Sequence, residues 1–78
     1  MNWKAVESSQ ISEVGYDADS KTLGIRFKPG KRSPASEYHY ENVPAEVHNH
    51  LVNAESVGRH FGEHIKSNPT KYPYRKVS

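Results

Sequence analysis

Two histidines in the C-terminal half of the chain are spaced like a metal-binding pair. The segment His60-Phe61-Gly62-Glu63-His64 matches H-x-x-E-H, a zinc-peptidase pattern in which both histidines bind the metal. On a helix these histidines lie one turn apart, so a shared metal ion is geometrically feasible. A catalytic site also needs a third ligand and an enclosing cleft, and a glycine weakens the helix. We therefore expect no metal site here, and a metal-dependent hydrolase is the remote alternative.

Tyr38 and Tyr40 are a second candidate for chemistry, because aromatic rings can stack on the bases of a nucleic acid. The two tyrosines are separated by one residue, so in a strand they face the same side. On an open face beside Arg26 they would form a stacking surface, whereas on the inner face they would pack in the core. Only 33% of the residues are hydrophobic, so the core needs these rings and we expect the inward orientation.

The charged residues are arranged in blocks that nearly cancel. Residues 1–20 carry a formal charge of −3, residues 21–36 of +5, residues 37–55 of −4 and residues 56–78 of +4, which leaves +2 for the chain. If the two basic blocks meet in space they form a patch for phosphate contacts and base stacking; otherwise they are an ordinary solvated surface. The candidate nucleic-acid contacts are Arg26, Lys28, Lys31, Arg32, Lys71, Tyr72, Tyr74, Arg75 and Lys76, and the patch would also include Lys66.

The composition excludes several classes of protein. With 78 residues and no cysteine, we expect a single domain over residues 1–78, without disulfides and in the cytoplasm. The apolar runs are too short for a membrane span, and we expect no signal peptide. No nucleophile stands beside a base, and no phosphate-binding glycine loop is present. We therefore identify no catalytic residue and predict a non-enzymatic protein.

Three segments have the alternating pattern of strands. They cover Ser8–Tyr16, Thr22–Phe27 and Glu37–Glu41, and the clearest is the second. In the first segment Ile11 is out of phase with Val14, which predicts a late start or a β-bulge near Ser12. The long connection before the third strand contains two prolines and a glycine, which predict a loop.

The period then changes to that of helices. Val43, Val47, Leu51 and Ala54 form one apolar stripe, with Pro44 in the first turn and Asn42 as candidate cap. A second helix is predicted from its cap and its stripe, and it ends before Asn68-Pro69. The residues that define this second helix are Ser56, Val57, Phe61 and Ile65.

These elements predict an α+β domain of β-β-β-α-α order. Sequential strands with short links form an antiparallel meander, and the two helices pack together on one of its faces. We expect the ordered core to cover about residues 3–68. Residues 69–78 should form an extended or flexible basic tail, because Pro73 disfavours a central strand there.

A combination of short motifs resembles a known family. The motifs are Ser8-Ser9-x-Ile11-x-x-Val14-Gly15-Tyr16-Asp17, Leu23-x-Ile25-x-Phe27, Gly30, Tyr38-x-Tyr40, Val43-Pro44, Leu51, Ala54-x-Ser56-x-Gly58-Arg59, Phe61 and Ile65. Together they resemble the KTSC domain, which is named for a C-terminal extension of some lysyl-tRNA synthetases and also forms small bacterial proteins. The resemblance covers residues 3–77, and the family's Y-x-Y motif falls on Tyr38 and Tyr40.

The resemblance implies no enzymatic activity and no cofactor, and its context suggests RNA binding. This suggestion rests on association with a tRNA ligase rather than on site chemistry. The sequence departs from the family pattern in two places. The connection from Lys28 to Glu37 is longer than usual and adds Lys31 and Arg32, and His60 stands where an aromatic residue is more common.

The sequence leads to two main hypotheses of function. The first is a small module that binds RNA, tRNA included, through its basic loop and tail. The alternative is a module for protein–protein interaction or self-association, because a small sheet leaves strand edges open. We expect a monomer, with a dimer as the other outcome, and no membrane partner.

Overall fold

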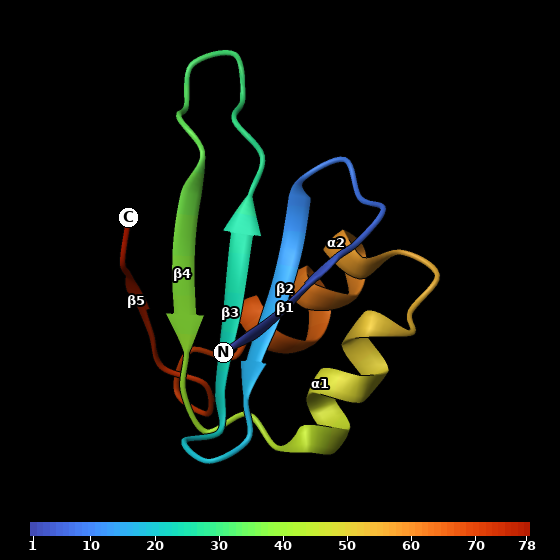
Figure 1. Cartoon of the computed structure of the whole chain (residues 1–78), viewed down its shortest axis with the longest axis vertical. Helices are drawn as coiled ribbons and strands as arrows, with labels where there is room; N and C mark the ends of the chain where they lie inside the picture. The colour runs from blue at the N-terminus through green and yellow to red at the C-terminus, as the bar shows by residue number, and fades with distance from the viewer.

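Five strands form one antiparallel sheet in the computed structural model, which describes all residues from 1 to 78 (Figure 1). The strands are β1 (Asn2–Ala5), β2 (Ile11–Asp17), β3 (Thr22–Phe27), β4 (Ser36–Tyr40) and β5 (Tyr74–Lys76), and they lie in the order β1-β2-β3-β4-β5. The predicted α+β class is confirmed. The predicted three-stranded meander is only the centre of the sheet, because a further strand is added at each edge.

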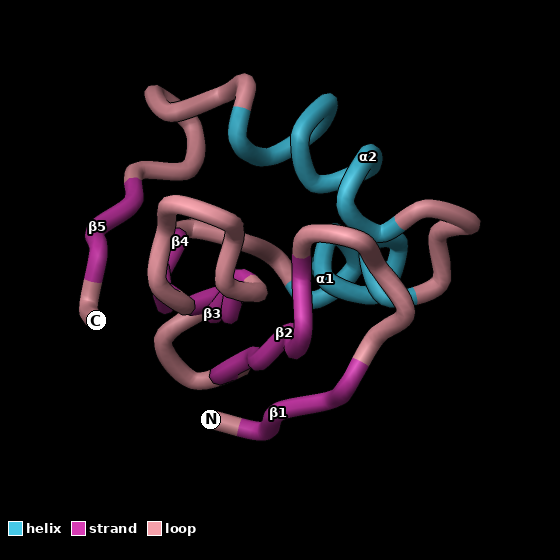
Figure 2. The backbone as a smooth tube through the Cα atoms, turned by 90° about the horizontal axis from the view of Figure 1, so that it is seen from above, coloured by secondary structure: helices cyan, strands magenta, loops and turns pink.

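The helices cover one face of this sheet (Figure 2). Helix α1 (Ala45–Val52) is followed by α2 (Val57–Phe61), which continues into a π-helical turn, η1 (Gly62–Lys66). Neither helix approaches the length or hydrophobicity that a crossing of the bilayer requires. The core lies between the two layers and contains Ile11, Val14, Leu23, Ile25, Tyr40, Val43, Leu51, Val57, Phe61, Ile65 and Tyr72.

The predicted β-bulge is present in β2. Its register against β3 shifts between Ile11 and Glu13, and the Ser12 hydroxyl donates a hydrogen bond to the Arg26 carbonyl over 3.1 Å. The extra residue turns both Ile11 and Val14 inward, and both are fully buried. The bulge therefore explains how two residues that are out of phase serve the same core.

The two helices begin differently. The Ser56 hydroxyl accepts a hydrogen bond from the Arg59 amide, so the predicted cap of α2 is confirmed. The prediction that Asn42 caps the first helix is wrong. Pro44 is the N-cap of α1, and Asn42 instead takes a left-handed backbone conformation with φ of 61° in the turn after β4. Asparagine tolerates this conformation better than most residues.

Strands β1 and β5 are additions that the sequence pattern does not predict. Residues 69–78, expected to lie outside the core, bring Tyr72 into it, where the residue is 4% exposed. Pro73 precedes β5 and does not interrupt it, and β5 needs ladder hydrogen bonds on only one side because it is an edge strand. The C-terminal segment is therefore part of the domain.

Candidate functional site

Tyr38 and Tyr40 both face the helical side of the sheet, as predicted. Tyr40 lies opposite Leu23 in the β3–β4 ladder, and Tyr38 lies opposite Ile25. Tyr40 is 3% exposed and packs edge-to-face on Phe61, with 5.2 Å between ring centroids, whereas Tyr38 is only half-buried. One tyrosine of the pair thus belongs to the core, and the other keeps part of its ring at the surface.

The half-buried ring faces a surface depression, which we call the aromatic hollow. It has a volume of about 420 Å³ and is lined by Phe27, Ser36, Tyr38, Tyr40, Lys66, Pro69 and Tyr74. The ring of Tyr74, which is 55% exposed, stands 5.4 Å from that of Tyr40 and 6.0 Å from that of Tyr38. The hollow therefore offers several aromatic surfaces beside one ammonium group.

Burial affects the chemistry of one hydroxyl in the aromatic hollow. Desolvation raises the pKa of Tyr40 to about 12, and the neighbouring phenols of Tyr74 and Tyr38 add to the shift. The Tyr40 hydroxyl therefore stays protonated at physiological pH. It can act as a neutral hydrogen-bond donor at the floor of the hollow, but it is a poor general base.

Of the basic residues in the predicted patch, only Lys66 lines this hollow. The loop that carries Lys28, Lys31 and Arg32 connects Phe27 to Ser36, and both of these residues line the hollow. From the opposite edge, Lys76 lies across the ladder from Tyr38 and thus shares its face. The register separates Arg75 from this group, because it pairs with His39 on the other face.

Two further predicted contacts, Lys28 and Lys71, do not line the aromatic hollow. The Lys28 ammonium donates a hydrogen bond to the Ser8 carbonyl over 2.6 Å, yet the residue remains exposed. The Lys71 ammonium lies 5.5 Å from the centroid of the Tyr72 ring. Tyr72 itself is buried, and its ring serves the core, so the prediction that it stacks on a base is wrong.

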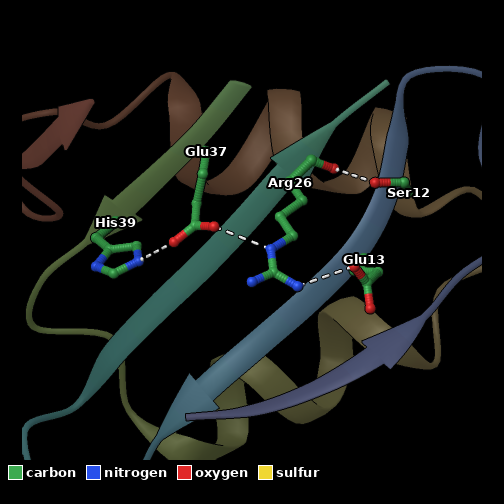
Figure 3. Close-up of polar contacts among 5 residues, drawn as sticks. All are labelled: Ser12, Glu13, Arg26, Glu37 and His39. Atoms are coloured by element: carbon green, nitrogen blue, oxygen red, sulfur yellow. Dashed lines mark hydrogen bonds and ion pairs between the residues drawn. The ribbon is translucent and has the colours of Figure 1, made fainter. Parts of the chain in front are cut away.

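Arg26 is the second predicted contact that the structure removes from the set. Its Nε donates to Glu37 Oε1 over 2.9 Å and its Nη1 to Glu13 Oε1 over 3.0 Å (Figure 3). Its guanidinium carbon also lies 3.8 Å from the centroid of the Trp3 ring. Arg26 therefore points to the outer face of the sheet, away from the aromatic hollow, and its charge is already paired.

The paired arginine belongs to a closed polar network on that outer face. Glu37 also contacts His39 Nε2 through its second oxygen, over 2.9 Å (Figure 3). The hydrogen bond from Arg26 is the main cause of the lowered pKa of Glu37, and the contact with His39 lowers it further. Below this network Trp3 covers Gly15 and Gly24, where an added Cβ would lie 2.8 Å and 2.6 Å from atoms of the indole.

The zinc-peptidase pattern has no metal-binding geometry behind it. The rings of His60 and His64 do lie together, with centroids 4.4 Å apart. Glu63, which would be the catalytic carboxylate, accepts a hydrogen bond from Arg59 Nε over 2.7 Å. Nowhere in the chain do three or more side chains of His, Asp or Glu lie in an arrangement that could hold a metal ion.

The sequence and the fold are both similar to those of known proteins. A family model of the KTSC domain matches residues 7–72. The chain belongs to the KTSC domain family. Its fold agrees with the crystal structure of a KTSC domain protein from Yersinia pestis, with a TM-score of 0.81 and 34% identity over 99% of this chain and 97% of that one.

Two relatives show the settings in which the KTSC domain occurs. An uncharacterised protein of Stutzerimonas stutzeri is 37% identical over 94% of this chain and 93% of its own length. A lysine–tRNA ligase of Nostoc punctiforme is 36% identical over 92% of this chain, but the match covers only 11% of the ligase. The domain is thus found both in a small protein and as a minor part of a much larger enzyme.

Some residues of the aromatic hollow were not among the predicted contacts. Phe27 was assigned only to the core, and Pro69 only to the end of a helix. Lys66 was placed in the basic patch but not among the nucleic-acid contacts. The turn after η1 brings Lys66 and Pro69 to the rings of β3, β4 and β5. Sequence spacing carries no signal for this meeting, because it depends on where the helical layer ends relative to the sheet edge.

Proposed function

We propose that this KTSC domain binds single-stranded RNA, and that one base of the RNA occupies the aromatic hollow. The observation that carries the proposal is the presence of exposed aromatic surface and a lysine in one depression. Tyr74 and Tyr38 supply the rings and Lys66 the positive charge. Proteins that bind single strands combine these two elements, with base stacking for affinity and cations for the backbone.

The exposed ring of Tyr74 is the main stacking surface in this proposal. A base that enters the hollow stacks on Tyr74, with Tyr38 at its edge and the neutral hydroxyl of Tyr40 below it. Unpaired bases in loops and at chain ends, such as those of tRNA, can be turned outward to make this contact. A base within a duplex lacks this freedom, so we expect a preference for unpaired RNA.

The backbone of the RNA would follow the basic side chains around the aromatic hollow. Lys66 lies on its wall, Lys76 lies on its β5 side, and the loop from Phe27 to Ser36 contributes Lys31 and Arg32. Phosphate contacts of this kind predict an affinity that falls as salt concentration rises.

The occurrence of the domain in a lysine–tRNA ligase supports this proposal by its context. Such an enzyme acts on tRNA, and an appended module that binds unpaired RNA would add affinity for the same molecule. The stand-alone relative from Stutzerimonas stutzeri lacks that context, so the site chemistry carries the proposal.

The test is an RNA titration with a set of matched variants. A labelled single-stranded RNA and a tRNA are titrated at two salt concentrations, and Tyr74→Ala is expected to weaken binding about 10-fold or more, because a stacked base contributes about 1–3 kcal/mol. Tyr74→Phe keeps the ring and should retain most of the affinity. Lys66→Gln should weaken binding, whereas Lys4→Gln on β1, at the far edge of the sheet, should not.

The alternative function is docking to a protein or to a second copy of the chain. Both edge strands leave one side of their backbone unpaired, although β5 is short and carries Arg75 and Lys76, which discourage edge pairing. Light scattering over a range of concentrations tests self-association. If no RNA binds even at low salt while a protein partner is captured after nuclease treatment, the RNA proposal is wrong.

A further inference from the structure

Three histidines line a second depression, on the other side of the segment that follows η1. We call it the histidine hollow; its volume is about 340 Å³, and its lining residues are Val47, His50, His60, His64, Asn68, Lys71 and Tyr72. The histidines come from three elements, α1, α2 and η1. Helix packing therefore assembles this cluster, and the H-x-x-E-H pattern describes only two of its members.

The side chains of this hollow can donate hydrogen bonds and carry positive charge. Imidazoles, an ammonium, an amide and a phenol all offer N–H or O–H groups. The hollow itself contains no carboxylate. The nearest acids, Glu55 and Glu63, border an adjacent depression together with Arg59, and Glu63 is held by Arg59 Nε at 2.7 Å.

The neighbouring histidines disfavour the protonated form of His60. The pKa of His60 is lowered, first by burial and then by the nearby His64 and His50, while Glu63 opposes the shift. The other charged groups around the ring are Lys71, Arg59 and Glu55. An anion bound among these imidazoles would offset the repulsion between their protonated forms, because it attracts each positive charge.

We propose that the histidine hollow binds a phosphodiester group of the RNA strand, more tightly as pH falls. The inference rests on the proposed function, since the strand that carries this phosphate is the one whose base enters the aromatic hollow. The segment from His64 to Tyr72 separates the two hollows, with Lys66 and Pro69 lining one and Asn68 and Lys71 lining the other. A strand that crosses this segment contacts both.

The direction of the pH effect follows from linkage. A bound anion stabilises protonated imidazole and raises its pKa, so binding takes up protons. A phosphodiester keeps its single negative charge across the range in which histidine titrates, and the change therefore arises in the protein. Each histidine whose pKa rises by about one unit contributes a factor of about 10 in affinity at low pH.

The experiment measures binding of a short single-stranded RNA between about pH 7.5 and about pH 5.5, the range in which histidine titrates. The affinity of the unaltered protein should rise about 10-fold or more toward low pH. The double variant His60→Gln, His64→Gln should lose most of this rise. His39→Gln is the matched control, because His39 lies on the outer face of the sheet and should leave the rise unchanged.

A second measurement separates this inference from the proposed function. Sulfate is titrated into the protein while the imidazole resonances are followed by NMR. The imidazole resonances of His60 and His64 should shift, and those of His39 and His48 should not. RNA binding that depends on Tyr74 but not on pH, with no response to sulfate, overturns this inference and leaves the proposed function intact. A response to sulfate without RNA binding supports an anion site and overturns the RNA proposal.

Discussion

Both faces of the sheet carry aromatic rings and basic side chains, but these groups are paired with each other on one face only. On the outer face, Arg26 lies against Trp3 and is paired with Glu13 and Glu37, so the aromatic ring and the cation satisfy each other. On the helical face, Tyr74 and Lys66 line an open depression and neither has a paired partner of this kind. The comparison teaches that residue type does not identify a binding site; what matters is whether its groups are already paired.

The largest expected effect concerns the helical face, because the core lies there. Phe61 is 2% exposed and contacts the rings of Tyr40 and Phe27, with centroids 5.2 Å and 5.8 Å away. Phe61→Ala removes this packing and should lower the free energy of unfolding by about 3–5 kcal/mol. Urea unfolding measures the change. A loss below about 1 kcal/mol would show that the helical layer is not the main source of stability.

A smaller loss is expected when the ring on the outer face is displaced. In Gly15→Val the new side chain would collide with the Trp3 ring, whose atoms lie 2.8 Å from the Cβ position. We expect the free energy of unfolding to fall by about 1–3 kcal/mol and the fluorescence emission of the single tryptophan to shift to the red.

The matched control for that substitution is a glycine in open space. At Gly62 an added Cβ meets nothing within 4 Å, and the backbone is helical with φ of −62°. Gly62→Ala should therefore leave stability unchanged or raise it by up to about 1 kcal/mol. Equal losses at both glycines would contradict the claim that Trp3 packs closely on β2.

Removal of the paired arginine should change stability but not RNA binding. The Arg26 side chain is 39% exposed, so solvent screening reduces the contribution of its two ion pairs. We expect Arg26→Ala to lower the urea midpoint by less than Phe61→Ala does, and to leave RNA affinity within about 2-fold. Lys76→Ala should instead weaken RNA binding and leave the free energy of unfolding nearly unchanged. A marked loss of RNA affinity in Arg26→Ala would place the binding site on the outer face.

The smallest expected effect is a pH dependence of stability from Glu37. Its pKa is lower in the folded protein, so its contribution to stability is present above the unfolded pKa and is lost as pH falls through the folded pKa. We compare urea midpoints at about pH 6 and about pH 3, on either side of a carboxyl pKa. The urea midpoint of Glu37→Gln should fall less on acidification than that of the unaltered protein. An equal fall in both proteins would show that Glu37 does not titrate in this way.

The central part of the fold could be predicted because its residues carry a local pattern. Thr22–Phe27 alternates strictly and matches β3 at both ends. The phase change between Ile11 and Val14 indicated the bulge, and Ser56 indicated the start of α2. In each case residues close in sequence determine the local structure, so the sequence pattern is enough to predict it.

The edge strands could not be predicted in the same way. In β1 only Trp3 is large and apolar, and all three residues of β5 are exposed. Their order depends on pairing with β2 and β4 and, for β1, on a ring that covers Gly15 and Gly24 across two other strands. Two glycines facing one another in neighbouring strands were the available sign that another group approaches there.

The candidate site was predictable only as a set of residue types. The list of basic residues and tyrosines included Tyr74, which lines the aromatic hollow, and Lys76, which lies opposite Tyr38. It also included Arg26 and Tyr72, which belong to the outer network and to the core. Ion pairing and burial made the difference. Both depend on partners distant in sequence, such as Glu13 for Arg26.

The central claim is that RNA binds at the aromatic hollow and not on the outer face. The most direct test is NMR mapping of the labelled protein during titration with a short single-stranded RNA at low salt. We predict that the aromatic resonances of Tyr38 and Tyr74 and the amide of Lys66 shift together, while the indole of Trp3 and the guanidinium of Arg26 stay unchanged. Shifts centred on Trp3 and Arg26, or no shifts at any RNA concentration, would contradict the account.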